Sequence, residues 1–296
     1  MPPKADRGRA VQAARELLEN AKVVDAPVDP FAIARGMEIV LQPIDKENVD
    51  FSGCLLREGQ VWGILYRNDI NVEGFKRFTV AHELGHHEMT HHHDAIFANG
   101  NLHASQSNFT SNLWHEQEAD CFAAELLMPS GLFTAAIHDT TIGLPAIKSL
   151  SDRFLTSLTS TAIRYAGLSH DPVAIIVSER SCILYCFTSP CMRTIRADYI
   201  ERATRVPAGT ETDRHFKSSP SPGDERQGRS YLSAWFEKPT RDLEFNEDVI
   251  DLGRYGKVLT VLHATEIPDE EEIEELDMEE DAEANKFNRD GKRISW

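Results

Sequence analysis

The sequence predicts a mixed α+β protein with more than one domain. Its 296 residues are enough for two domains, and a hydrophobic content of 41% is ordinary for a globular chain. Apolar residues at helical spacing alternate with short runs of strand-forming residues, both early in the chain and beyond residue 171. We therefore expect a first domain with a small mixed sheet at 1–135, a helical segment at 136–170 and an α/β domain at 171–265.

The first elements are helical and are followed by strands. Residues 6–23 carry an amphipathic helical pattern, and two prolines precede a short second helix near residues 31–35. Strand-like runs rich in branched residues follow at 39–42, 54–56 and 61–66. A longer helical pattern without proline then begins near Phe75.

This longer helix contains the segment Phe78-Thr-Val-Ala-His-Glu-Leu-Gly-His86. His82 and His86 are four residues apart, so both imidazoles lie on one helix face and can reach one metal ion. Glu83 lies close enough to act on a water molecule at that metal. The pattern is the His-Glu-x-x-His signature of zincins. It predicts a zincin-like domain in which His82 and His86 bind Zn²⁺, with Mn²⁺ as the alternative ion, and Glu83 is the catalytic base.

A third ligand is expected because catalytic zinc takes three protein ligands and keeps one position open. The helical pattern at 115–127 offers several carboxylates. Glu116 and Asp120 share one helix face, so Glu116 can bind the metal while Asp120 supports a ligand histidine. Glu118 is the rival ligand. Glu125 is expected on a solvated face.

Three other side chains are candidates for contacts with substrate or with a developing oxyanion: Tyr66, His91 and His103. The histidines that crowd the end of the zinc-motif helix are expected to be mostly exposed to solvent, with His103 in the polar loop that follows. An extended substrate is expected to add to the edge of the strand at 61–66.

The middle and the C-terminal parts are less specific. Residues 141–167 predict two helices with a helix-turn-helix look, but their basic residues are too few for phosphate binding, so a packing role is expected. Two strands at 172–178 and 182–187 predict a hairpin, and a later strand is expected at 258–263. A long mobile loop is expected at 207–229.

The net charge of −17 is concentrated near the C-terminus. Residues 266–283 hold twelve acidic residues and no basic ones, whereas residues 284–296 carry +3 and residues 1–265 carry −8. We expect residues 266–296 to be a disordered acidic tail; docking on a basic partner is the alternative. The five cysteines and the absence of a long apolar run lead us to expect a cytoplasmic protein with reduced thiols and no membrane contact.

Taken together, the first 135 residues resemble the ImmA/IrrE-type metallopeptidase family. The similarity extends from the residues before the second helix, through the strands, to both signature helices, with His91 at the family's extra histidine position. Five segments carry it: Ala26–Met37, Phe51–Leu55, Ile64–Asn68, Arg77–His86 and Glu116–Pro129. The family pattern often has Gln at the position of Glu118, which favours Glu116 as the ligand.

The resemblance implies a zinc endopeptidase that cleaves a helix-turn-helix repressor or antitoxin, encoded nearby, and so derepresses genes of a stress, phage or mobile-element response. In longer family members a sensor-like domain similar to GAF domains occupies the position of residues 171–265. Two alternatives stay open at this point. The chain can be a non-catalytic metal-binding regulator that acts by protein binding, or a DNA-binding transcription factor that uses residues 141–167. Direct nucleic-acid binding is not expected, because the charge is acidic.

Overall fold

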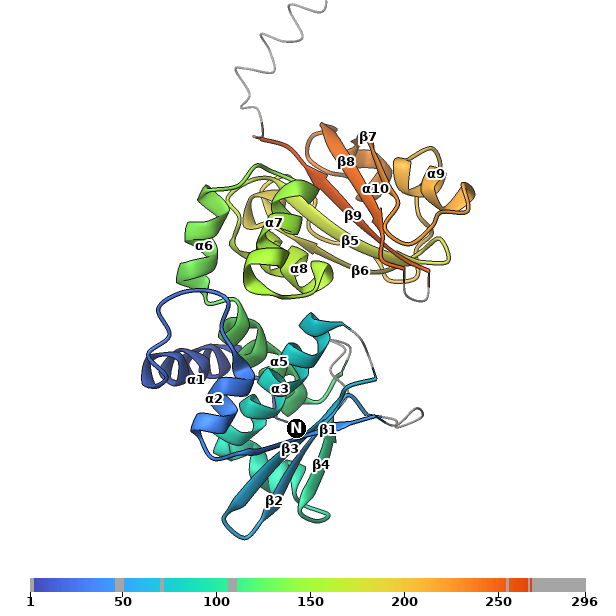
Figure 1. Ribbon diagram of the computed structural model, residues 1–296. Coiled ribbons are helices and arrows are strands. Elements are labelled where there is room, and N and C mark those ends of the chain that lie inside the picture. Colours follow the sequence, from blue (N-terminus) through green and yellow to red (C-terminus); the bar gives the residue numbers. More distant parts are fainter. Residues whose placement is uncertain are drawn as a thin grey trace, which may run out of the picture.

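The chain folds into a mixed α+β structure with two separate sheets (Figure 1). The computed structural model describes residues 3–45, 51–69, 72–105, 111–253, 256–265 and 267. The acidic tail that we expect at residues 266–296 lies outside this part except for Ile267, so its disorder stays a prediction.

The first sheet has four strands in the order β1-β3-β2-β4. Strands β1 and β3 are parallel and the other two pairs are antiparallel, so the sheet is small and mixed, as predicted. The strands are β1 (Val40–Ile44), β2 (Gly53–Glu58), β3 (Val61–Arg67) and β4 (Leu102–Ser105). The prediction of a polar loop at His103 is wrong, because His103 lies in β4. This strand is short and partly exposed, and only its pairing with β2 defines it.

Two long helices pack against each other, and the first of them also packs against this sheet (Figure 1). They are α3 (Glu73–Glu88), which carries the zincin motif, and α5 (Trp114–Leu127). A Cβ on Gly85 would lie 3.0 Å from the ring of Phe122, so the missing side chain lets α5 approach closely. Around this pair lie α1 (Arg7–Asn20), α2 (Pro30–Gly36), η1 (Thr90–His92) and α4 (His93–Ile96). The pair therefore brings two distant segments of sequence side by side.

Helices α6 (Ser130–His138), α7 (Leu144–Phe154) and α8 (Leu158–Leu168) connect the two sheets. The helices expected within residues 141–167 are present. Their apolar side chains, including Ile147 and Tyr165, belong to a core that runs from α1 to the second sheet. A Cβ on Gly74 would lie 2.8 Å from the backbone nitrogen of Ser157, so α3 begins directly against the α7–α8 turn. Packing therefore explains this segment.

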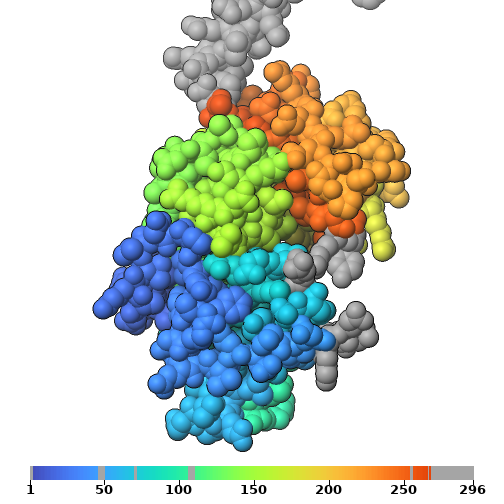
Figure 2. Space-filling view, in the orientation of Figure 1, coloured from blue at the N-terminus to red at the C-terminus, as the bar shows by residue number. Residues whose placement is uncertain are grey.

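The second sheet has five strands in the order β6-β5-β9-β8-β7, and all neighbours are antiparallel. Its strands are β5 (Val173–Glu179), β6 (Cys182–Thr188), β7 (Glu225–Tyr231), β8 (Glu244–Asp251) and β9 (Lys257–His263). In β5, Val173, Ile175 and Val177 face the core shared with α6–α8, and the alternate residues face a second core. Burial of both faces explains the continuous apolar run. Figure 2 shows the residues of α6–α8 in contact with both the N-terminal and the C-terminal parts of the surface.

The expected hairpin forms between β5 and β6, with Arg180 and Ser181 at φ of +51° and +61° in its turn. The prediction of a long loop at 207–229 is wrong, because this range contains α9 (Glu211–Lys217) and most of β7. Thr210 caps α9 through its side chain, and β7 is an edge strand whose polar residues hide its pairing. Strand β8 was not predicted either. Shorter helices are η2 (Pro190–Arg193) and α10 (Leu232–Trp235).

Two general expectations can be compared with the fold. All five cysteines are free thiols, in agreement with the sequence analysis. No single helix among the described residues is long and apolar enough to cross a membrane, whereas the bent pair α5 and α6 passes on length and composition.

Candidate metal centre

His82 and His86 point the same way from α3, as their spacing requires. Both side chains are fully buried, and their Nε2 atoms lie 3.1 Å apart. Burial raises the cost of a charge on either imidazole, and the neutral form is the one that binds metal ions. Helix α3 therefore supplies two nitrogen ligands aimed at one point.

Glu116 comes from α5 and completes the set. Its Oε2 lies 3.2 Å from Nε2 of His82, and its Oε1 lies 3.3 Å from Nε2 of His86. Ligand atoms bound about 2.0–2.1 Å from a tetrahedral zinc ion lie about 3.3 Å from one another. The three side chains thus have the spacing and the chemistry of a catalytic zinc site, and they fit the ion that the motif implies.

The Nδ1 atom of each motif histidine has a hydrogen-bonding partner. Nδ1 of His82 lies 2.9 Å from Oδ1 of Asp120, one turn of α5 beyond Glu116. Nδ1 of His86 lies 3.0 Å from Nδ1 of His92. A partner at Nδ1 fixes the tautomer and the ring orientation, so each Nε2 lone pair stays directed at the metal position. Asp120 thus occupies the place expected of a supporting residue.

Glu83 lies beside this centre without an ion-pair partner of its own. Its side chain is fully buried, and neither carboxylate oxygen has a hydrogen-bond partner among the described residues. Burial raises the pKa of Glu83 to about 8, and nearby His82 opposes this rise. A Cβ on Gly53 of β2 would lie 2.7 Å from Oε1 of Glu83, so only glycine leaves room for the carboxylate. A titratable carboxyl group therefore lies next to the metal position.

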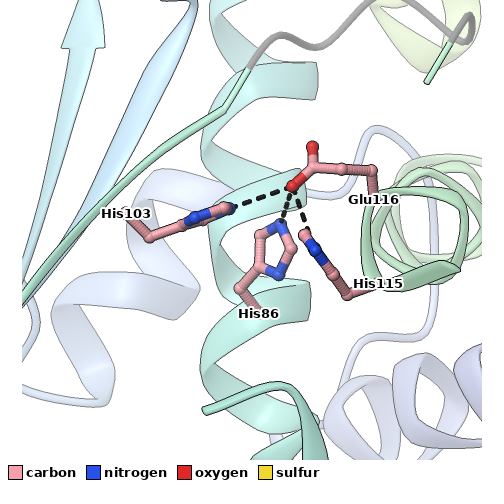
Figure 3. A group of neighbouring side chains, drawn as sticks. All are labelled: His86, His103, His115 and Glu116. Atoms are coloured by element: carbon pink, nitrogen blue, oxygen red, sulfur yellow. Dashed lines mark hydrogen bonds and ion pairs between the residues drawn. The ribbon is translucent and has the colours of Figure 1, made fainter. Parts of the chain in front are cut away.

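Two further histidines converge on Glu116 (Figure 3). Nε2 of His103, from β4, lies 2.9 Å from Oε1 of Glu116, and Nδ1 of His115 lies 3.1 Å from the same oxygen. With His86 they form a group whose ligand atoms all lie within 4.8 Å of one another. The site is therefore richer in imidazoles than the motif alone indicates.

The charges in this cluster follow from its contacts. Burial lowers the pKa of His82, but hydrogen bonds to Asp120 and Glu116 outweigh this effect and raise it to about 10. Burial opposes the charge on Glu116, yet contacts with His103, His115 and the motif histidines hold its pKa far below its ordinary value. For His86, burial dominates and lowers the pKa well below 6.5. Glu116 is therefore an anion, the form that binds a cation.

The other candidates lie away from the three ligands. Glu118, the rival ligand, binds His91 and His92 instead, with its Oε2 at 2.7 Å and 3.0 Å from their Nε2 atoms. The ring of Tyr66 packs edge-on against Phe31, with centroids 5.2 Å apart. No hydrogen bond or ring contact joins Tyr66 to the metal ligands within the described ranges. The geometry thus brings Glu116 and His103 to the centre and leaves Glu118, His91 and Tyr66 outside it.

Two expectations of exposure are wrong. His92 is fully buried, because η1 turns it back toward His86. Glu125 is buried as well and pairs with Arg15 and Arg164. No pattern in the sequence assigns a role to His115 or Gly53. The position of His115 next to Glu116 is, however, a signal from which its role could be predicted. No local signal in the sequence marks Gly53.

The comparisons with known proteins agree with this site. Residues 34–164, which include all the ligands, match the M78 peptidase family model, described as the IrrE N-terminal-like domain. The chain matches none of the curated proteins with which it was compared. A solved structure described as a Mycobacterium tuberculosis transcriptional regulator is similar with a TM-score of 0.54 and 13% identity, over 86% of this chain and 76% of that chain. At this identity the likeness concerns the fold alone. The match of residues 34–164 to the IrrE N-terminal-like domain therefore confirms the family that the motifs resemble.

Proposed function

We propose that this protein is a zinc-dependent endopeptidase whose substrate is a helix-turn-helix repressor or antitoxin. One observation carries the proposal. The Nε2 atoms of His82 and His86 lie 3.1 Å apart, and each lies 3.2–3.3 Å from one carboxylate oxygen of Glu116. Beside them is the buried carboxyl group of Glu83, whose oxygens form no hydrogen bond among the described residues. A ligand set with a free carboxylate beside it supports hydrolysis better than a purely structural metal site.

A zinc ion held by these three residues would polarise the scissile carbonyl and make a water molecule more acidic. Glu83 accepts the proton of the attacking water while the water oxygen bonds to the carbonyl carbon. It then passes this proton to the amide nitrogen as the C–N bond breaks. The hydroxyl of Ser105 lies near enough to lower the pKa of Glu83, but neither carboxylate oxygen forms a hydrogen bond among the described residues, so both can take part in this transfer. Asp120 keeps the ring of His82 in place throughout.

The substrate is expected to bind at β4 rather than at the strand before the motif helix. Strand β3 is paired on both sides, with β1 and β2, so the expectation that its edge holds a peptide is wrong. Strand β4 pairs only with β2 within the described residues, which leaves its other edge open. His103 of the same strand reaches Glu116. An extended peptide added to β4 would therefore pass the metal position.

The nature of the substrate rests on the family and not on this geometry. The test is incubation of the purified protein with the helix-turn-helix protein encoded beside it, followed by intact-mass spectrometry. We expect two new fragments that disappear with a chelator and return with added zinc. Binding without new fragments would favour the alternative of a non-catalytic regulator.

We also propose that residues 171–265 form a sensor domain that binds a small ligand. Its support is a set of buried polar groups beneath α9. Oε1 of Glu247 accepts hydrogen bonds from the backbone and the hydroxyl of Thr212, but Oε2 has no partner, and neither has Nδ1 of His215. Thermal-shift screening with nucleotides and small metabolites tests this role. Absence of any stabilising compound would count against it.

A further inference from the structure

A chain of hydrogen-bonding groups runs from His86 away from the metal position. Nδ1 of His86 lies 3.0 Å from Nδ1 of His92, and Nε2 of His92 lies 3.0 Å from Oε2 of Glu118. Both imidazoles are fully buried, and the Glu118 side chain is 2% exposed. Water therefore cannot replace these contacts easily.

Only one placement of the protons on His86 and His92 is compatible with these hydrogen bonds when His86 binds a metal. A neutral imidazole that binds a metal through Nε2 carries its proton on Nδ1. His86 must therefore donate from Nδ1, and Nδ1 of His92 must accept. A neutral His92 then carries its own proton on Nε2, where it donates to the carboxylate of Glu118. Every member of the chain has one donor facing one acceptor, so a metal at His86 and this tautomer of His92 favour each other.

Glu118 is itself anchored by two other groups. Its Oε1 accepts a hydrogen bond from the backbone nitrogen of Asp6 at 2.7 Å. Its Oε2 also lies 2.7 Å from Nε2 of His91. The ring of Trp114 packs edge-on against His92, with centroids 5.2 Å apart. His92 is thus held at both nitrogens and by its ring. Asp6, just before α1, is thus joined to Glu118, which lies 112 residues away in sequence.

We propose that His92 is a positioning residue for the ligand His86 and that Glu118 fixes its tautomer. This inference rests on the proposed function, because it assumes a metal ion at His82, His86 and Glu116. It assigns a supporting group to the second motif histidine, as Asp120 supports the first. Loss of such a supporting group weakens metal binding 10- to 100-fold in typical sites.

A second metal site at His91, His92 and Glu118 is the competing explanation, since their ligand atoms all lie within 4.8 Å of one another. A metal there would need the lone pair on Nε2 of His92 and would move its proton to Nδ1. That proton would face the proton on Nδ1 of His86 across 3.0 Å, two donors without an acceptor. Metal binding at His92 and at His86 would therefore oppose each other, which favours the positioning role.

The experiment compares two amide substitutions of His92 in the full chain. In His92→Asn, the side-chain oxygen takes the place of Nδ1 and can still accept from His86. In His92→Gln, the amide extends to the place of Nε2 and leaves His86 without an acceptor. Zinc affinity is measured by competition with a chromophoric chelator, and the Co²⁺-loaded protein gives a visible spectrum that reports ligand geometry. We expect Gln to weaken zinc binding at least 10-fold and to change the spectrum, whereas Asn stays within about threefold.

His87→Asn is the matched control, because His87 contacts Glu88 and Trp62 and none of the metal ligands. It should bind zinc like the wild type. Thermal melting of each variant without metal separates unfolding from loss of affinity. If His92→Gln does not fold, His92→Leu removes the same acceptor with an apolar side chain and should give the same loss.

The outcomes are distinct. Wild-type affinity in His92→Gln, or equal losses in the Asn and Gln variants, would overturn the positioning role. Two zinc ions per wild-type chain, with one lost on Glu118→Gln, would overturn it in favour of the second metal site. A wild type that binds no zinc at all would instead refute the proposed function on which the inference rests.

Discussion

Substitution of Gly53 by alanine tests whether the space around Glu83 is needed for activity. A Cβ at this position lies 2.7 Å from Oε1 of Glu83 and 2.5 Å from Cγ2 of Thr79. Carbon and oxygen atoms in close contact lie about 3.3 Å apart, and two carbon atoms about 3.5 Å. The carboxylate must therefore move by about 0.6 Å and the methyl group of Thr79 by about 1 Å.

This displacement predicts a large loss of activity and a smaller loss of stability. A catalytic group misplaced by about 1 Å costs about 100-fold in rate, or about 2.7 kcal/mol of transition-state stabilisation. Crowding in a packed core costs about 1–3 kcal/mol of the free energy of unfolding. The three atoms nearest to the new methyl group belong to Thr79 and Glu83 and to none of the ligands, so zinc affinity should stay unchanged.

The assay measures kcat/KM for cleavage of the protein substrate together with zinc affinity and the melting temperature. Gly63→Ala in the neighbouring strand is the matched control, because its Cβ would meet nothing closer than 3.6 Å. The control should cleave normally. A Gly53→Ala protein that is folded, binds zinc and cleaves within about twofold of the wild type would refute the reasoning about Glu83.

Two further substitutions and one deletion test other parts of the molecule. Asp120→Ala removes the acceptor 2.9 Å from Nδ1 of His82, so zinc affinity should fall about 10- to 100-fold in chelator competition, and an unchanged affinity would contradict the supporting role. Arg164→Met leaves the buried Glu125 with Arg15 as its remaining cationic partner and should lower the free energy of unfolding by about 3 kcal/mol in denaturant titrations. Arg180→Met, at a side chain that is 88% exposed, should change nothing. Burial raises the pKa of Glu125, but Arg164 outweighs it and holds this pKa below its ordinary 4.5, so the stability from this pair is present above pH 4.5 and is lost as the pH falls below it. This acid-sensitive part of the unfolding free energy should shrink in Arg164→Met. Deletion of residues 266–296 should leave cleavage and substrate affinity unchanged, and a weaker affinity would support docking of the acidic segment on a basic partner.

The parts of the site that lie within one helix follow from the sequence. The spacing of His82 and His86 fixes their common direction wherever α3 forms, and the same holds for Glu116 and Asp120 on α5. Their meeting across the two helices is a tertiary fact. It depends on Gly85, whose missing side chain admits Phe122, and the sequence shows the glycine without showing its neighbour.

The failures have a common physical cause. Polar residues usually lie in solvent or in loops, which is the position that the sequence predicts for His92, His103 and Glu125. Each of them instead forms a hydrogen bond with a residue on another secondary-structure element. Strand β7 was missed for a related reason. Its polar edge position gives no apolar alternation, so only its pairing with β8 defines it.

The assignment of a zinc peptidase with Glu83 as its base is tested by Glu83→Gln, with cleavage and zinc content measured on the same preparation. The amide has nearly the same size as the carboxylate but cannot accept the proton of the attacking water. We expect one zinc ion per chain, an unchanged melting temperature and no fragments of the helix-turn-helix substrate by mass spectrometry. A Glu83→Gln protein that cleaves the substrate at the wild-type rate would contradict the assignment of this chain as a zinc peptidase with Glu83 as its base.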